Sequence, residues 1–356
     1  MPRLRTFLVV PFFILSAYSP PACPQVTDSL QYAGQVSAPI RTVRYPEVIY
    51  PHGILPDWDR GLVLSHGIEK YSDAKAATVV VYDRGGQRIR EGHIWPAGAE
   101  NVEIFRTAAT HDGAVVASGG ATMADGSINR FLAKTDLSGN TIQTIFTGVF
   151  ASSQICEAED RTVWALGREI DEGQPRGDVL RQYSFERGFL RSYLPIESVQ
   201  ARWNSAKPWF NAFGSLLRCG KEKVSVYLRF TGEYVEIDAK SGEMKRWKLG
   251  LSSSDRNRVS GLAITDDGRV YMTLDRGALR LFEIRPNASG SNVALLPIQA
   301  SATLQDEINQ QCRRGGESCG HLIRVWGTDG NDLALWFSDM GDISSVRVTQ
   351  AEIAGN

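Results

Sequence analysis

The chain has 356 residues, of which 42% are hydrophobic and 22% are charged. This composition is ordinary for a protein with a large buried core, and it excludes intrinsic disorder. The formal net charge at pH 7 is −1, and the basic residues form no run. The charge pattern therefore gives no electrostatic footprint for nucleic acid or for an anionic membrane surface.

Residues 1–22 have the pattern of a signal peptide. Two arginines precede the apolar run Thr6–Ser16, which is too short to span a bilayer. A buried N-terminal strand is the alternative, but polar, proline-containing sequence follows at once. Two prolines stand before Cys23 where a lipoprotein signal needs leucine and a small residue, so anchoring through Cys23 is not expected. We expect a periplasmic or secreted protein with no membrane span.

Residues 23–39 are expected to be a flexible segment, and the alternating sequence Ile40–Tyr45 predicts a strand. A repeat then follows: strand, acidic or glycine-containing turn, strand, polar linker, strand, hairpin, strand. Asp83, Asp136 and Asp238 each stand shortly before a glycine and mark the last hairpin in three copies. The repeat recurs in five complete copies: Ile54–Ile94, Thr107–Ile145, Ile155–Leu194, Leu216–Leu249 and Gly261–Ile298.

The last copy supplies only three strands, Leu322–Trp326, Leu333–Phe337 and Ser345–Thr349. Adding Ile40–Tyr45 as its outer strand completes it, and closing the ring removes free sheet edges. We therefore predict an all-β fold, a six-bladed β-propeller of four-stranded antiparallel blades over residues 40–350. The N-terminal strand closes the ring, and residues 351–356 form a C-terminal tail.

The clearest copy, VSGLAITDDGRVYMTLDRGALRLFEI, resembles a blade of the six-bladed propeller superfamily that contains NHL-repeat, SMP-30-like and TolB-like propellers. The resemblance covers about residues 40–350 and implies an architecture without a particular activity. A seven-bladed ring is the alternative, because Gln299–Cys319 could contain a further strand pair. We interpret residues 299–320 as an insertion between blades that includes a short helix.

The cysteines predict disulfides, since an exported chain lies in an oxidising compartment. Cys312 and Cys319 enclose a polar loop with two glycines, and we expect this pair to be bridged. Cys156 and Cys219 are a possible second pair. There is no Cys-x-x-Cys motif and the spacing does not fit a zinc ribbon, so a metal or redox role for these thiols is not expected.

Propeller ligands usually bind at the central channel, where loops enter the innermost strands. Aligning the copies places six residues at that entrance: His52, Phe105, Ser153, Ser215, Ser260 and His321. Glu103 and Asn211 lie in loops of the same type. His52, Glu103 and His321 could bind a divalent metal or provide acid–base catalysis. The alternative is that they are polar residues bonded to water and loop carbonyls. A full set of the metal ligands of SMP-30-like lactonases cannot be matched.

Other features remain open. Trp203 and Trp209 precede an inner strand and could stack on a sugar or a partner protein, or fill the gap between blades. His111 lies in a turn and is expected to be solvated. No G-x-S-x-G elbow, P-loop or H-E-x-x-H motif is present.

We therefore predict a monomeric, non-catalytic propeller of the cell envelope or secreted fraction. It would bind a small molecule or an envelope protein, without a cofactor and without nucleic acid. The alternative is a propeller enzyme, a metal-dependent hydrolase or lactonase or a lyase, that uses residues at the channel entrance.

Overall fold

The structure is a computed structural model. It describes residues 34–44, 57–66, 78–169, 177–199, 215–275, 279–287, 289–314, 323–337 and 342–350. The chain divides into two compact units, residues 1–30 and 31–356, and all the described residues belong to the second. Within the described ranges, no helix is long and apolar enough to cross a membrane.

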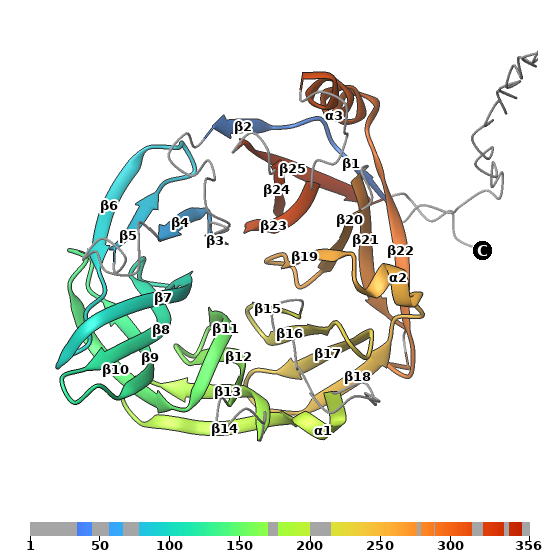
Figure 1. The fold of residues 1–356 in the computed structure, drawn as a ribbon. Helices are drawn as coiled ribbons and strands as arrows, with labels where there is room; N and C mark the ends of the chain where they lie inside the picture. The colour runs from blue at the N-terminus through green and yellow to red at the C-terminus, as the bar shows by residue number, and fades with distance from the viewer. Residues whose placement is uncertain are drawn as a thin grey trace, which may run out of the picture. The chain divides into compact units, whose positions relative to one another are not determined.

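Among the described residues, four sheets each consist of four consecutive antiparallel strands (Figure 1). The first contains β3 (Asp57–Asp59), β4 (Leu62–His66), β5 (Thr78–Tyr82) and β6 (Arg88–His93). The second contains β7 (Ala99–Ala109), β8 (Val115–Met123), β9 (Ile128–Thr135) and β10 (Thr141–Gly148). The third contains β11 (Phe150–Glu157), β12 (Val163–Glu169), β13 (Asp178–Ser184) and β14 (Gly188–Pro195). The fourth contains β15 (Leu216–Cys219), β16 (Lys223–Leu228), β17 (Glu233–Asp238) and β18 (Met244–Lys248).

The remaining described strands form one nine-stranded sheet. It contains β19 (Val259–Ile264), β20 (Val270–Asp275), β21 (Leu279–Pro286), β22 (Val293–Ala300), β23 (Ile323–Asp329), β24 (Asp332–Phe337) and β25 (Asp342–Gln350). The N-terminal strand β1 (Gly34–Val36) joins its two halves, because it pairs in parallel with β22 and antiparallel with β25. The next strand, β2 (Arg41–Arg44), also pairs with β25. The described helices are α1 (Ile196–Val199), α2 (Ser253–Arg256) and α3 (Ala302–Arg314).

The three predicted aspartate turns are confirmed as hairpin turns between the third and fourth strands of their sheets. Asp83 accepts hydrogen bonds from the backbone amides of Gly85 and Gln87 at 2.7 and 2.8 Å. Asp136 and Asp238 accept backbone amides of the residues that follow them in the same way. Aspartate side chains that bond the backbone two residues on stabilise tight turns, so these hairpins are specified locally.

The core lies between successive sheets rather than inside any one of them. Between the second and third sheets, for example, Val116 and Leu132 pack against Ile155 and Val163, and all four are buried. The first strands of neighbouring sheets also contact one another: β3 contacts β7, β7 contacts β11, β11 contacts β15, β15 contacts β19, β19 contacts β23, and β23 contacts β3. Figure 1 shows these six first strands facing a common centre. Four-stranded antiparallel sheets that pack face to face around a centre form a β-propeller.

The structure differs from the sequence-based expectations in three places. Gly34–Val36 forms β1, although no strand is predicted in that stretch, because three residues are too few for an alternating pattern to stand out. The predicted strand Ile40–Tyr45 is present as β2, but it pairs with Asp342–Ser345, and β1 pairs with Val348–Gln350. The second sheet begins at Ala99 instead of Thr107. The helix expected within residues 299–320 is present as α3.

Candidate functional site

Half of the predicted site residues lie outside the described residues. These are His52, Trp203, Trp209, Asn211 and His321. Cys319 also lies outside the described residues, so the expected Cys312–Cys319 disulfide stays a prediction. The metal hypothesis built on His52, Glu103 and His321 therefore stays a prediction. Among the residues that are described, no cluster of three His, Cys, Asp or Glu side chains could hold a metal ion.

Three of the predicted entrance residues occupy the same place in their sheets, at a bulge of the first strand. The register shifts between Ile104 and Arg106 in β7, between Ser152 and Gln154 in β11, and between Val259 and Gly261 in β19. The unpaired residues are Phe105, Ser153 and Ser260. The repeat alignment was therefore consistent, but these residues lie within strands and not in the loops that precede them. A bulge re-aims side chains at the edge of a sheet, which explains their recurrence.

The entrance serines are used within their own sheets. Ser153 Oγ donates to the carbonyl of Leu166 at 3.1 Å, and Ser260 Oγ lies 3.4 Å from the carbonyl of Thr273. Ser215, which directly precedes β15, accepts the backbone amide of Arg229 at 3.2 Å. Ser153 and Ser215 are also buried. These hydroxyls therefore bond to backbone groups of their own sheets.

Glu103 lies in a row of four residues across the second sheet. The strand register places Glu103 opposite Gly120, Gly120 opposite Arg130, and Arg130 opposite Gly148. Residues that are directly opposite in antiparallel strands place their side chains on the same face of the sheet. We call these four residues the Glu103 row. Because both neighbours of Arg130 are glycines, the row has charged side chains at two positions and no side chain at the other two.

The guanidinium of Arg130 occupies the space above Gly120. A Cβ atom added to Gly120 would overlap Nη1 of Arg130 and would lie 3.4 Å from Cζ of Phe105. The guanidinium carbon also lies 5.1 Å from the centre of the Phe105 ring, a cation–π distance. A Cβ atom on Gly148 would meet no atom within 4 Å, so this side of Arg130 is open. Gly120 thus allows Arg130 to lean toward Glu103, and Phe105 holds it there.

The carboxylate of Glu103 and the guanidinium of Arg130 have no hydrogen-bond or ion-pair partner among the described residues. Burial raises the pKa of Glu103, and the positive charge of Arg130 acts in the opposite direction. Both side chains are partly buried. Two opposite charges without a hydrogen-bond or ion-pair partner among the described residues therefore lie on one face of the second sheet, beside the Phe105 ring.

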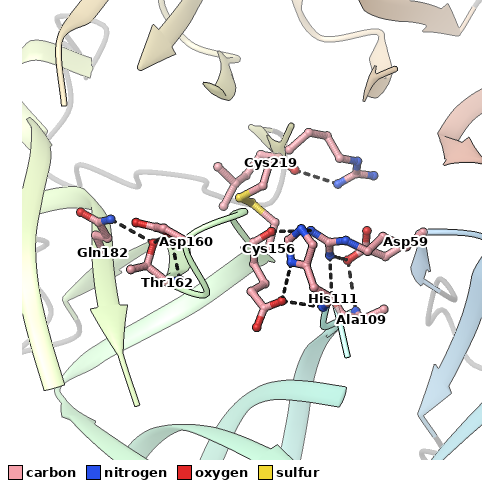
Figure 2. Close-up of a disulfide and its surroundings, with 12 residues drawn as sticks. Asp59, Ala109, His111, Cys156, Asp160, Thr162, Gln182 and Cys219 are labelled. Atoms are coloured by element: carbon pink, nitrogen blue, oxygen red, sulfur yellow. Dashed lines mark hydrogen bonds and ion pairs between the residues drawn. A yellow bond between two sulfur atoms is a disulfide. The ribbon is translucent and has the colours of Figure 1, made fainter. Parts of the chain in front are cut away.

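A second charged cluster lies at the other end of the first strands, where they turn into the second strands (Figure 2). Arg60, which follows β3, donates to the carbonyls of Ala109 and Glu157, each at 2.7 Å. Its guanidinium therefore joins the first sheet to the second and the third. Arg218 in β15 similarly donates to the carbonyl of Trp326 in β23 at 2.9 Å. These arginines also link strands that are not in successive repeats, β3 with β11 and β15 with β23.

His111 is the residue of this cluster that the sequence analysis assigned wrongly. Its side chain is only 19% exposed, and Nδ1 lies 2.8 Å from a carboxylate oxygen of Glu157, which is 2% exposed. The other ring nitrogen lies 2.8 Å from the carboxylate of Glu159. The expected solvation fails because the turn after β7 packs on the turn after β11. Both ring nitrogens are bonded to carboxylates of the third sheet, so the cluster connects two sheets.

A disulfide joins Cys156 at the end of β11 to Cys219 at the end of β15, with a Cα–Cα distance of 5.7 Å (Figure 2). This is the pair that the sequence analysis treated as only possible. Cys156 is buried, and it directly precedes Glu157, the partner of His111. The disulfide therefore fixes the third sheet to the fourth beside the cluster that fixes the second to the third.

A cleft of about 500 Å³ lies between the turns of the fourth sheet and the β19–β20 turn. Several of its charged side chains pair with one another: Lys221 with Asp266 at 3.2 Å, and Lys223 with Glu236 at 2.8 Å. Asp238 is used in its own turn. Because these charges are already compensated and the remaining Glu222 is exposed, the cleft is a weaker candidate for a ligand site than the Glu103 row.

Comparison with known proteins finds no matching family model and no matching curated protein. Solved structures of similar fold include a protein of unknown function from Bacteroides thetaiotaomicron, with 10% identity, coverage of 89% of this chain and 75% of that one, and a TM-score of 0.47. The Cps50 (Swd1) β-propeller domain of Myceliophteria thermophila has 13% identity and a TM-score of 0.43, and the match covers 88% of this chain and 89% of that domain. The Dos1 propeller has 10% identity and a TM-score of 0.39, and the match covers 82% of this chain and 68% of that one. The fold stated above rests on the strand pairings of the chain itself, and these likenesses assign no activity.

Proposed function

We propose that this chain is a non-catalytic, ligand-binding β-propeller whose site is the partly buried surface around Glu103, Phe105 and Arg130. One observation carries the proposal. The His111 side chain and most charged side chains of the cleft pair with other groups of the protein, and the unpaired Glu222 of the cleft is exposed, whereas Glu103 and Arg130 are partly buried and have no such partner among the described residues. Partly buried charges without partners are costly to the fold, and a ligand that pairs with them recovers that cost.

The proposed architecture is a propeller of six blades, closed by the N-terminal strands. The cyclic contacts of the first strands support this number, including the contact of β23 with β3. The helix α3 occupies the stretch in which a seventh blade would need strands. The pairing of β1 and β2 with β25 supports closure by the N-terminal part of the chain. Membership of the six-bladed superfamily named above is part of the same proposal.

The proposed location is the periplasm or the exterior of the cell. The signal-peptide pattern of residues 1–22 supports it. The Cys156–Cys219 disulfide agrees with this location, because structural disulfides persist in oxidising compartments.

The proposal is tested by screening organic anions, sugars and amino acids against the mature protein with ligand-observed NMR. The wild type is compared with the double variant Glu103→Gln/Arg130→Gln. The matched control is Arg280→Gln, because the guanidinium of Arg280 lies over Phe282 at 5.5 Å, outside the Glu103 row. We expect at least one compound to bind the wild type and the control but not the double variant, and to be recovered unchanged.

Two outcomes would contradict this function. Binding that persists in the double variant would remove the site, and conversion of the bound compound to a product would remove the non-catalytic assignment. A complete absence of hits in the three compound classes would also count against a small-molecule site at this position.

A further inference from the structure

We infer that the mature protein forms a symmetric dimer in which the outer strand β10 pairs antiparallel with β10 of a second copy. The inference does not depend on the ligand site proposed above. It departs from the monomer expected from the sequence, because only the strand order shows that this strand is an outer edge.

Strand β10 is the outer edge of the second sheet (Figure 1). Among the described residues it pairs with β9 alone. In an antiparallel pair, alternate residues direct their backbone amides and carbonyls away from the partner strand, so an edge strand offers these groups to a further strand. The start of β10 is joined to the first sheet, where Thr141 Oγ1 donates to the carbonyl of His93 at 3.0 Å. The pairing inferred here uses the residues that follow Thr141.

The other outer strands are protected in ways that β10 is not. Strand β6 has two arginines and a glutamate, β14 has an arginine and a proline, and β18 has two lysines and an arginine. The edge of β22 is covered by β1. Charges, prolines and covering segments are the usual protection of sheet edges against pairing with another chain. Strand β10, with the sequence TIQTIFTG, has no charge and no proline, and the bulges near its ends leave residues 143–146 in regular register.

Exposed apolar side chains gather at this edge. Of the nine large hydrophobic side chains that are exposed among the described residues, five belong to residues 128–149. Ile142 and Phe146 of β10 are 54% and 46% exposed, and the exposed Val149 follows the strand directly. Gathered apolar side chains on a protein surface mark contacts with other proteins. The edge therefore combines backbone groups that can pair with apolar surface that a partner would bury.

The sequence of β10 fits a second copy of itself. In a two-fold antiparallel pair, the residue on the axis faces the same residue of the other chain. With Thr144 on the axis, Ile142 of each chain faces Phe146 of the partner subunit. Thr–Thr pairs and aromatic–β-branched pairs both stabilise antiparallel strands. A pair centred on Ile145 would instead place Ile142 opposite Gly148 of the partner subunit, so Thr144 gives the better match. Such a contact uses the same surface of both chains and closes as a dimer.

The test is analytical ultracentrifugation of the mature protein over a range of concentrations. The wild type should show a monomer–dimer equilibrium. Ile142→Lys/Phe146→Lys places like charges opposite one another and should raise the dissociation constant of the dimer roughly tenfold or more. Ile142→Lys/Phe146→Glu places opposite charges there and should restore most of the lost affinity. Residues 142 and 146 are about 13 Å apart along one strand, so pairing within a single chain cannot explain the restoration.

The matched control is Ile89→Lys in the outer strand β6, because Ile89 and Phe146 have the same exposed fraction, 46%. This change should leave the dissociation constant as it is. The Lys/Glu variant also controls for folding, since a restored dimer requires folded chains. A wild type that stays monomeric up to its solubility limit would overturn the inference, as would a dimer that the Lys/Lys variant leaves unchanged. Loss of the dimer in both double variants would overturn the pairing centred on Thr144.

Discussion

Reduction of the Cys156–Cys219 disulfide should destabilise the protein by about 4 kcal/mol. The two cysteines are 63 residues apart in sequence. In the chain-entropy account, a cross-link that closes a loop of this length lowers the entropy of the unfolded chain by an amount worth about 4 kcal/mol at 25 °C. The value is an upper estimate where the reduced, unfolded chain retains structure. The third and fourth sheets remain packed through the core residues Leu166 and Leu217 in either redox state.

The assay is guanidinium denaturation followed by tryptophan fluorescence, with the oxidised protein, the reduced protein and the variant Cys156→Ser/Cys219→Ser. The variant should unfold at a lower denaturant concentration than the oxidised wild type, and the reduced wild type should unfold at the same concentration as the reduced variant. The slope of the transition should rise on reduction, because the unfolded chain becomes less compact. A loss of less than about 1 kcal/mol would refute the reasoning, since it would mean that the loop constrains the unfolded chain very little.

The remaining predictions concern the other links between sheets and the charged row. If the Cys312–Cys319 bridge is present, a reductant should lower the stability of the Cys156→Ser/Cys219→Ser variant by a further 2–3 kcal/mol or so, and no change would contradict that bridge. Deleting residues 24–46 should lower the free energy of unfolding by about 3–5 kcal/mol, because the deletion removes β2 and the fully buried Val36 of β1. A denaturation midpoint that does not change would disprove closure by these strands. His111→Ala should cost about 2–3 kcal/mol, since it deprives the buried Glu157 carboxylate of a partner, and a double-mutant cycle with Glu157→Gln should show coupling of the two changes. Glu103→Gln should raise the melting temperature at pH 7 but not at pH 4. Burial raises the pKa of Glu103 in the folded state above its value in the unfolded chain, so the folded state loses stability as pH rises through the folded pKa and the carboxyl group ionises. Gln does not ionise, so the variant avoids this loss at pH 7. An equal gain at both pH values would show that ionisation is not the cause.

The parts of the fold that the sequence predicts are those specified within one repeat. The aspartates of the predicted hairpins cap their own turns, as Asp136 does with Ser138 and Asn140, so each turn could be identified without knowledge of its neighbours. Closure of the last sheet was predicted from a missing strand, although β1 was too short to detect.

The site residues were harder to predict because they depend on register and on contacts between repeats. Glu103 and Arg130 are 27 residues apart, and only the pairing of both with Gly120 reveals that they share a face. The available signal was the pair Gly119–Gly120 inside an apolar strand, since a glycine within a strand often marks a place where another group approaches the backbone closely. The contacts of His111 with Glu157 and Glu159 join turns of successive repeats. Aligning those turns would have placed these residues near one another.

The pairing of β1 with β22 and β25 has a consequence for the order in which the protein folds. Gly34 pairs with Gln350, more than 300 residues later, whereas the hairpins of the first four sheets pair residues within a few tens of positions. Local pairings form quickly, and pairings of such large sequence separation carry most of the loop-closure entropy and form slowly. The four sheets can therefore assemble while the strands at both ends of the chain are still apart. During that interval the free edges of β22 and β25 are open to pairing with another chain, so aggregation should compete with the last step of folding more than with any earlier one.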